Sequence, residues 1–416
     1  MLSVTEAQHA ILATIRRLDP ETTPLLEASG RVLAEDVTAD SALPPFDNSA
    51  MDGYAVRAAD LIEATPDRPV RLPIVADVPA GHPSDIELAA GTAARITTGA
   101  MLPRGADTVV PVEDTDDGAR GASALLKSVA IFKSFERGAH VRASGTDVQR
   151  GEKVLSTGAL IRPSEIALLS AVGHSRVQVY RRPRVAVFAT GDELVAPDQQ
   201  PGPGQIRNVN EYSTAALVMR YGGVPLLLGI AHDRMADVAA KLEEAIGQGA
   251  DLIVASAGVS VGAYDVVKDA VKAHGSIDLW KVRMRPGKPV AFGAYRQVPF
   301  FGLPGNPVSA MMTFEQFVRP ALRLMSGFTQ WQKPTVKVEL LEAISSDGRE
   351  TYARAWVERR EGQWIARLSG GQGSNMLNSL ARANALVIVP DGLTRLEAGA
   401  TAQAQMLDWP EELDAR

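Results

Sequence analysis

The chain has 416 residues, of which 45% are hydrophobic and 22% charged, a composition ordinary for a globular protein of more than one domain. It has no cysteine, which excludes disulfides, thiolate metal sites and a cysteine nucleophile and suits a reducing cytoplasm. The net charge is −6 with acids and bases interspersed, and no apolar stretch approaches the ~20 residues that span a bilayer. We therefore expect a cytoplasmic protein without nucleic-acid or membrane partners.

The N-terminal residues 1–20 predict a helix. Ser3 and Glu6 fit a capping box, and the apolar residues Ile11, Leu12 and Ile15 fall on one helical face. This order lacks the basic-then-apolar pattern of a signal peptide.

A change of character at residues 46–140 predicts a small β domain. Short β-like runs at 70–75, 93–97 and 108–112 lie between turns rich in Gly, Pro and Asp. The flanking residues 21–45 and 141–180 are mixed and predict a linking domain. Its clearest element is a helix over 163–172, capped by Ser164 and stopped by Gly173.

Residues 184–327 alternate between strand and helix patterns, which predicts a doubly wound, mostly parallel sheet with helices on both faces. The expected strands cover residues 184–189, 225–230, 252–255 and 299–302. The expected helices cover residues 211–221, 235–246, 265–273 and 308–325. With residues 1–20, the segment 181–327 forms the expected α/β domain.

Residues 334–409 lose the helical period, which predicts a C-terminal β barrel or sandwich domain over 328–416. Residues 352–368 form an expected hairpin that turns at Glu361 and Gly362. Further strands are expected at 387–389 and 401–407.

Polar side chains follow each expected strand of the α/β domain. Residues 190–193 follow the first strand, His232 and Asp233 the second, Ser256, Ser260 and Asp265 the third, and residues 303–309 the fourth. Ligands of parallel sheets bind beyond the carboxyl ends of the strands. Each group alone is an ordinary turn or helix cap, but their coincidence on one edge predicts a binding site.

The third strand leads into Ser256-Ala257-Gly258-Val259-Ser260-Val261-Gly262, a run of small residues. Such residues let the backbone approach a ligand closely and point its N–H groups at an anion. The strand, this loop and Asp265 together indicate a pocket for a phosphate-bearing molecule.

The charges of this edge predict a divalent cation. The carboxylates of Glu193, Asp233 and Asp265 would repel one another and a phosphate, and Mg²⁺ with oxygen ligands resolves both conflicts. Lys288, in the basic segment 283–289, is a candidate for an oxyanion contact, although a solvated basic loop fits this segment equally well. The residues Asn306 to Ser309 open a helix, whose N-terminus favours anions.

Several common motifs are absent, and one segment is unusual. The chain contains neither a G-x-x-x-x-G-K-[ST] loop nor a G-x-G-x-x-G loop, which disfavours ATPase and dehydrogenase functions. The six histidines show no metal-ligand spacing. Residues 45–56 interleave Phe, Met and Tyr with acids, which favours a binding loop over a linker.

Six segments in this order resemble the molybdopterin molybdenumtransferase (MoeA) family, which is related to the C-terminal part of gephyrin-type proteins. They are FDNSAMDGYAV at 46–56, TGA at 98–100, TGDEL at 190–194, AGVSVGAYD at 257–265, PGKP at 286–289 and GLPGNPVSA at 302–310. The resemblance covers essentially the whole chain. One departure is Ala257, which stands where the family usually has Gly.

The resemblance implies a four-domain homodimer whose α/β domain is of the molybdopterin-binding type. It implies insertion of molybdate into adenylylated molybdopterin (molybdopterin-AMP) with release of AMP, dependent on Mg²⁺. Other proteins of molybdenum cofactor biosynthesis are the further partners that it suggests.

The resemblance also implies roles for particular residues. Catalytic roles fall on Asp52, Thr98, Asp233 and Asp265, of which Asp52 and Thr98 are expected to act across the dimer interface. The metal ligands are Glu193 and Asp265. Cofactor or oxyanion contacts fall on Ser256, Gly258, Ser260, Gly262, Lys288, Pro304, Gly305, Asn306, Pro307, Ser309, Arg354 and Ser374.

Two other functions stay open at this point. An adenylyltransferase that acts on molybdopterin would share the α/β domain and a similar loop, but it would not need the extra β domains. A non-catalytic dimeric scaffold would keep the fold, but it would not need Asp52, Glu193, Asp233 and Asp265.

Overall fold

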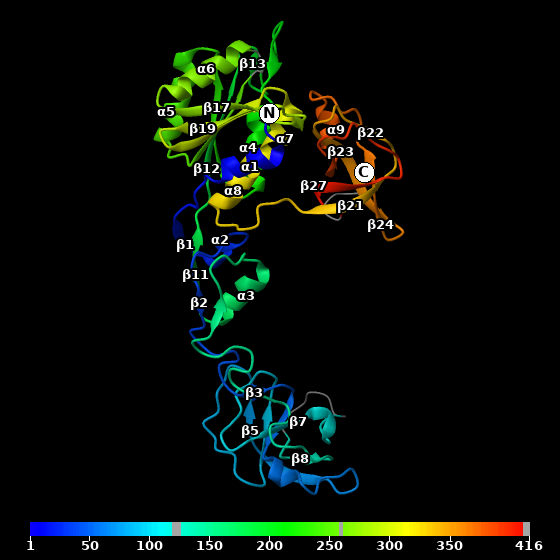
Figure 1. The fold of residues 1–416 in the computed structure, drawn as a ribbon. Coiled ribbons are helices and arrows are strands. Elements are labelled where there is room, and N and C mark those ends of the chain that lie inside the picture. The colour runs from blue at the N-terminus through cyan, green and yellow to red at the C-terminus, as the bar shows by residue number, and fades with distance from the viewer. Residues whose placement is uncertain (119–125, 258–260, 411–416) are drawn as a thin grey trace. The chain divides into compact units, whose positions relative to one another are not determined.

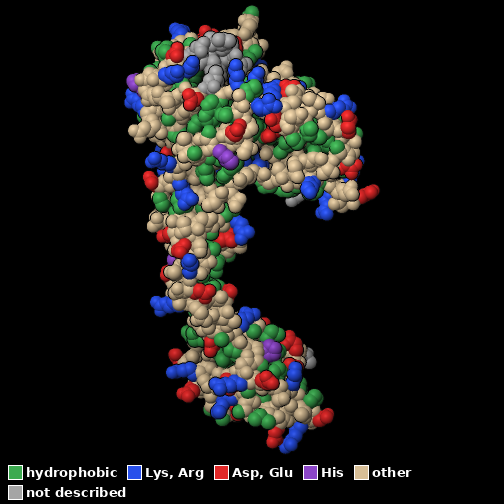
Figure 2. Space-filling view, viewed as in Figure 1, with side chains coloured by type: hydrophobic (Ala, Val, Ile, Leu, Met, Phe, Trp, Pro, Cys, Tyr) green, Lys and Arg blue, Asp and Glu red, His purple; other side chains and the backbone are tan. Residues whose placement is uncertain are grey.

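The computed structural model describes residues 1–118, 126–257 and 261–410, without the side chains of residues 257, 261–265 and 279. The chain forms two compact units (Figure 1). The first comprises Met1–Thr22, Gly30–Ala34 and Gln178–Arg416, and the second comprises Thr23–Ser29 and Glu35–Val177. The four-part division predicted above stays a prediction. Acidic and basic side chains are intermingled over the face seen in Figure 2. No helix among the described residues is long and apolar enough to cross a membrane.

A six-stranded sheet forms the centre of the first unit. Its strands, in spatial order, are β15 (Val224–Ala231), β12 (Arg184–Thr190), β16 (Leu252–Ala257), β20 (Val298–Pro304), β19 (Pro289–Tyr295) and β17 (Gly275–Lys281). The first four are parallel, and β19 is antiparallel to both of its neighbours. The prediction of a mostly parallel sheet is therefore confirmed, but β17 and β19 were not predicted.

Helices cover both faces of this sheet, as predicted. In β12, Val185 and Val187 belong to an apolar cluster with α1 (Val4–Leu12) and α4 (Asn210–Arg220). The alternate residues Ala186 and Phe188 belong to a second cluster, with α5 (Met235–Gly247) and α6 (Val261–Lys272). Because side chains alternate along a strand, one strand contributes to both cores.

Three predicted helices have different ends in the structure. The capping box of Ser3 and Glu6 is confirmed, but α1 ends at Leu12 and not near residue 20. Helix α6 begins at Val261, four residues before the expected start. Helix α3 (Pro163–Ala171) has Arg162 at its N-cap and not Ser164, because proline favours the first helical position.

The predicted helix 308–325 is interrupted by a π-helical turn. It consists of α7 (Pro307–Thr313), the π segment η3 (Phe314–Val318) and α8 (Arg319–Met325). Pro320 has no N–H to offer the carbonyl of Gln316, four residues earlier. Gln8 Nε2 donates to that carbonyl at 2.9 Å, so α1 satisfies the group that the proline leaves free.

The C-terminal part of the first unit is a closed β barrel. The sequence predicted a barrel or a sandwich, and the structure has the barrel. The ring runs through β23 (Glu350–Arg360), β24 (Gln363–Leu368), β21 (Thr335–Leu340), β27 (Thr401–Met406) and β25 (Ala385–Val389), which pairs again with β23. The predicted hairpin turn is confirmed, with positive φ at Glu361 and Gly362. Short strands β22 (Ile344–Ser345) and β26 (Arg395–Leu396) and helix α9 (Leu377–Ala381) complete this part.

The barrel is joined to the α/β part by a further strand pair. Strand β18 (Met284–Arg285) lies beside β23 in parallel, with Met284 opposite Glu350. The barrel residues Tyr352 and Leu386 belong to the same apolar cluster as α1 and α4. The two parts therefore share a core.

The second unit contains the predicted small β domain. A five-stranded sheet has the order β7 (Thr108–Pro111), β4 (Gly53–Val56), β6 (Ala93–Ile96), β5 (Val70–Val78) and β8 (Ser128–Ile131). The remaining short elements of this region are η1 (Ala58–Leu61), η2 (Val112–Asp114), β3 (Asn48–Ser49), β9 (Val141–Arg142), β2 (Val37–Thr38), β10 (Lys153–Leu155) and α2 (Leu25–Ala28). Strands β1 (Pro20–Pro24) and β11 (Arg176–Tyr180) lie where the chain passes between the units.

Candidate functional site

The carboxyl ends of the parallel strands carry polar residues at one edge of the sheet. Strand β12 leads to Asp192 and Glu193, β15 leads to His232 and Asp233, and β16 carries the buried Ser256 near its end. Strand β20 ends at Pro304, beside β16, and leads to Asn306. The sheet order therefore brings the polar groups of four neighbouring strands to one edge.

At the β12 and β15 ends, three acids and a histidine lie together. His232 Nδ1 lies 3.0 Å from Asp192 Oδ1, and the Asp233 N–H donates to the same oxygen at 3.3 Å. Burial, followed by repulsion from Asp192 and Glu193, raises the pKa of Asp233. The Oδ1 atom of Asp233 is buried and has no partner within the described chain. Asp192, which the motifs did not assign, is therefore the hydrogen-bonding centre of this acidic cluster.

Gly191 allows Glu193 to take its place in the cluster. The φ of Gly191 is +150°, and a β-carbon at this position would collide with the Glu193 carboxylate. A residue with a side chain would be strained at this φ and would shift the Glu193 carboxylate, so this turn favours glycine.

The acidic cluster fits a hard cation in its chemistry, although the described residues do not complete a metal site. Its donors are carboxylate oxygens, the ligands that Mg²⁺ prefers, and their mutual repulsion would be relieved by positive charge. No group of three His, Cys, Asp or Glu side chains within the described residues forms a metal-binding arrangement. The predicted ligand Asp265 lies in α6, and its side chain is outside the described set, as are Gly258 and Ser260. Gly262 lies in the first turn of α6.

A pocket of about 480 Å³ brings together many of the residues predicted to contact the cofactor. Its lining consists of Arg285, Pro286, Gly287, Lys288, Pro289, Pro304, Asn306, Ser309, Arg349, Gln372, Gly373 and Ser374. We call it the oxyanion pocket. None of these lining residues, all of them described, is acidic, whereas three are basic. The pocket therefore suits an anion.

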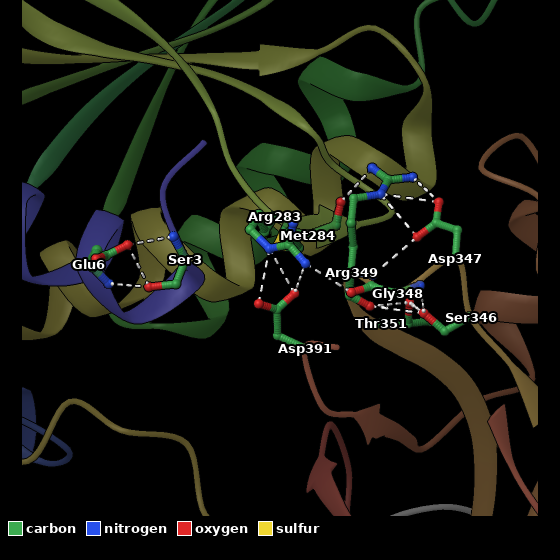
Figure 3. Close-up of polar contacts among 10 residues, drawn as sticks. All are labelled: Ser3, Glu6, Arg283, Met284, Ser346, Asp347, Gly348, Arg349, Thr351 and Asp391. Carbon is green, nitrogen blue, oxygen red and sulfur yellow. Dashed lines mark hydrogen bonds and ion pairs between the residues drawn. The ribbon is translucent and has the colours of Figure 1, made fainter. Parts of the chain in front are cut away.

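The three basic side chains of the oxyanion pocket differ in how they are held. Lys288 is exposed and Arg285 half-buried, and neither side chain has a hydrogen bond or ion pair within the described chain. Arg349 is fixed, because its Nη1 donates to the Met284 carbonyl at 2.9 Å and its Nη2 lies 2.5 Å from Asp347 Oδ2 (Figure 3). Two cations are thus free to contact a ligand, and the third is already oriented.

The Arg349–Asp347 pair belongs to a network that joins the barrel to the α/β part (Figure 3). The hydrogen bond from Arg349 lowers the pKa of Asp347 to about 2, so the pair is charged at neutral pH. Arg283 contacts both Asp391 oxygens at 2.9 Å and donates to the Gly348 carbonyl at 3.1 Å. This network fixes Arg349 at the junction of the two parts.

Arg354 lies beneath the loop that forms one wall of the oxyanion pocket. Its side chain is fully buried, and Nη2 donates to the carbonyls of Gly371 at 2.8 Å and Gly373 at 3.1 Å. Gln372 Oε1 accepts from the Arg354 N–H at 2.8 Å. Arg354 is absent from the pocket lining, and its geometry is that of a residue that positions the loop carrying Ser374.

A second pocket of about 530 Å³ includes the Gly305–Pro307 turn in its lining and shares Asn306 with the oxyanion pocket. Strands β13 (Leu194–Val195) and β14 (Ile206–Arg207) contribute to its lining, with Asn210, Asn306 and Asn375. Asn210 Nδ2 donates to the Gly305 carbonyl at 2.7 Å, while Oδ1 is buried and has no partner within the described chain. Asn210 was not predicted, and its buried amide oxygen, which lacks a partner within the described chain, suits a ligand that donates a hydrogen bond.

In the second unit, Asp52 and Thr98 form a direct contact. The Thr98 N–H donates to Asp52 Oδ1 at 2.6 Å, and both side chains are exposed. Strand β4 follows Asp52 and β6 precedes Thr98, and these strands pair in antiparallel fashion. The structure thus brings together two residues that lie 46 positions apart in the chain.

Comparisons with known proteins cover nearly the whole chain. Three family models match in order: the MoeA N-terminal region (domain I and II) at residues 2–173, the "Probable molybdopterin binding domain" at 186–324, and the MoeA C-terminal region (domain IV) at 337–407. The second model covers most of the α/β part and the third covers most of the barrel, whereas the first covers α1 and nearly all of the second unit.

Relatives match this chain over nearly its whole length. Molybdopterin molybdenumtransferase 2 of Mycobacterium tuberculosis (strain H37Rv) is 41% identical over 411 residues, covering 97% of this chain and 99% of that protein. Molybdopterin molybdenumtransferase of Nostoc sp. is 39% identical and covers 96% and 92%. The molybdopterin biosynthesis MoeA protein of Pyrococcus horikoshii OT3 superposes with a TM-score of 0.79 at 29% identity, covering 98% of this chain and 100% of that one. The chain therefore belongs to the molybdopterin molybdenumtransferase (MoeA) family.

Proposed function

We propose that this protein acts in molybdenum cofactor biosynthesis by inserting molybdate into adenylylated molybdopterin, with release of AMP. The oxyanion pocket carries this proposal, because it gathers three basic side chains and two serine hydroxyls without an acid in its lining. A tetrahedral dianion such as molybdate requires cations and hydrogen-bond donors converging on one point. Arg285, Arg349 and Lys288 supply the charge, and Ser309 and Ser374 supply hydroxyl donors.

The second pocket and the acidic cluster provide for the other substrate. The Gly305–Pro307 turn contributes to the linings of both pockets, so a pterin placed at Asn210 would reach toward the molybdate. Glu193, with Asp265, would hold Mg²⁺ at the diphosphate. When bound, Mg²⁺ would neutralise charge on the diphosphate and polarise it for cleavage.

Asp233 has a different role in this proposal. Its raised pKa brings proton exchange closer to neutral pH, and its buried Oδ1 has no partner within the described chain. We assign to it the orientation of a reacting water or oxo group. Asp52 and Thr98 would complete the site from the second unit of the other subunit of a homodimer.

The test is release of AMP from adenylylated molybdopterin by the purified protein with Mg²⁺, measured with and without molybdate. Release that depends on molybdate is expected. Lys288→Gln removes an oxyanion contact and should lower turnover about 100-fold. Lys337→Gln, a matched change at an exposed lysine of β21, should leave turnover unchanged.

Other outcomes would replace the proposal. Consumption of ATP with molybdopterin that lacks the adenylyl group would indicate an adenylyltransferase. No turnover with either substrate would indicate a scaffold. Asp265→Asn should lose most turnover while the protein stays dimeric, and near-normal turnover in that variant would refute its role as a metal ligand.

A further inference from the structure

A third pocket lies on the barrel, and the proposed reaction uses none of its residues. It has a volume of about 460 Å³ and is lined by Trp356, Arg367, Leu368, Ser369, Gly370 and Arg382. Trp356 of β23 and Arg367 of β24 are direct cross-strand partners. Cross-strand partners have β-carbons about 5 Å apart, so the side chains of Trp356 and Arg367 lie side by side on the same face of the hairpin. The neighbours Ala355, Val357 and Ala366 lie in the barrel core, so Trp356 and Arg367 are on the outer face.

This pocket has positive charge without a matching acid. The side chains of Arg367 and Arg382 are exposed and make no hydrogen bond or ion pair within the described chain. Arg354, two residues from Trp356 on the same face, is fully buried and contacts no carboxylate of the described residues; its Nη1 is buried without a partner. Glu358, the next acid on this face, pairs with Arg360 at 2.6 Å. The pocket therefore favours an anion.

Trp356 adds an aromatic surface to this charge. Its indole Nε1 donates to Glu358 at 3.2 Å, which orients the half-buried ring. Among the described residues no other aromatic ring is paired with it, whereas Trp364, on the same hairpin, is paired with Trp409 at 6.1 Å. A flat ring can stack on an unpaired indole, and a guanidinium can bind a phosphate with two hydrogen bonds.

We propose that this pocket binds a mononucleotide, with the base stacked on Trp356 and the phosphate paired with Arg367 and Arg382. Inorganic phosphate alone would leave the indole unused, and an uncharged ring would leave both guanidinium groups unused. This proposal does not depend on the reaction proposed above, although AMP serves as a convenient probe of the pocket.

The position of this pocket links it to the oxyanion pocket. Gly370 lines the one, and Gln372, Gly373 and Ser374 of the same loop line the other. The Ser369 N–H donates to the Arg354 carbonyl at 3.1 Å, and Arg354 in turn holds Gly371 and Gly373. A bound nucleotide would thus contact the loop that forms a wall of the oxyanion pocket.

The experiment is calorimetric titration of the full-length protein with AMP, adenosine and inorganic phosphate in turn. AMP should bind more tightly than either fragment. Trp356→Leu, and separately the double variant Arg367→Gln/Arg382→Gln, should each weaken AMP binding about tenfold or more. Arg359→Gln, a matched change on the other face of β23, should leave it unchanged. Circular dichroism confirms that each variant is folded.

Binding of AMP in the oxyanion pocket is distinguished by Lys288→Gln. AMP binding that persists in Lys288→Gln and weakens in the double variant supports the barrel pocket. Binding that is lost in Lys288→Gln and unchanged in the double variant overturns it while leaving the proposed reaction intact. Absence of AMP binding, or equal affinity for AMP and phosphate, also overturns it. Failure of the molybdate-dependent assay with normal AMP binding would refute the reaction alone.

Discussion

At the scale of single residues, Asp233 combines a role in the proposed reaction with an electrostatic cost to stability. Its carboxylate lies beside Asp192 and Glu193, and burial together with their charges raises its pKa. A raised pKa means that the folded state disfavours the ionised form, so the ionised carboxylate lowers the free energy of unfolding at neutral pH. This cost is understandable if the cluster exists to receive a cation.

We predict that Asp233→Asn stabilises the metal-free protein at pH 7 by about 0.5–1 kcal/mol and abolishes turnover. The gain should shrink as the pH falls through the raised pKa of Asp233 toward the ordinary value near 4, because protonation removes the same charge from the wild type. Thermal unfolding at pH 4 to 8 measures both effects.

Thermal unfolding also tests whether the acidic cluster binds Mg²⁺. Millimolar Mg²⁺ should raise the unfolding temperature of the wild type more than that of Asp233→Asn. Asp198→Asn, a change at an exposed acid outside the cluster, should respond to Mg²⁺ like the wild type. If Asp233→Asn lowers the unfolding temperature at pH 7, burial and repulsion from Asp192 and Glu193 do not determine the contribution of Asp233 to stability.

At the scale of elements, a buried ion cluster joins the long helix to the segment that enters the barrel. Lys333 Nζ lies 2.7 Å from Glu315 Oε2 in the π segment η3, and both side chains are less than 10% exposed. Tyr221, at the end of α4, donates to Glu315 at 2.7 Å and accepts from Lys333 at 2.8 Å. Burial lowers the pKa of Lys333 despite its acidic partner. A charged side chain that is buried in this way destabilises the protein strongly when its ion-pair partner is removed.

We predict that Lys333→Met destabilises the protein by about 3 kcal/mol, because it leaves Glu315 buried without its nearest cation. The double variant Lys333→Met/Glu315→Gln should recover part of this loss, because it removes the unpaired carboxylate but leaves the buried Arg319 without Glu315. Lys337→Met, at an exposed position of β21, should change stability by less than about 0.5 kcal/mol. Urea unfolding provides the free energies. Equal losses in the single and double variants would show that Lys333 contributes packing and not charge.

At the scale of the whole molecule, the predicted site residues are divided between the two compact units. Lys288, Asp233 and the pockets belong to the first unit, whereas Asp52 and Thr98 belong to the second. A site shared between subunits of a homodimer would unite them, and it makes a quantitative prediction.

A heterodimer of Asp52→Ala and Lys288→Gln subunits should have about half of the wild-type turnover, although each variant homodimer retains only a small fraction of it. One of its two sites combines the intact halves of both subunits. The heterodimer can be purified through two different affinity tags. As a control, a heterodimer of Lys288→Gln and Asp233→Asn subunits should stay as impaired as the variant homodimers. Lys288 and Asp233 both belong to the first unit, so each of the two sites contains one of the changes. An inactive first heterodimer would show that each site is built within one subunit.

Residues that lie within or directly beside a strong local sequence pattern could be predicted. Alternating strand and helix patterns predicted the parallel sheet, and strand ends predicted the edge where Asp233, Ser256 and Pro304 lie. The family motifs predicted Lys288 and Ser309, and the wider resemblance predicted Ser374; the fold brings all three into one pocket. Arg349 and Asn210 had no distinguishing local signal, since an arginine or asparagine in a polar turn is commonplace.

The sequence by itself determined the order of the elements, the chemistry of the strand ends and the family of the chain, because periodicity and motifs are local properties. Only the tertiary structure decided that β17 and β19 extend the sheet, that β18 pairs with β23, and that Arg349 thereby reaches the oxyanion pocket. These contacts join segments far apart in the chain. They depend on packing and on hydrogen bonds between strands, which no local pattern records.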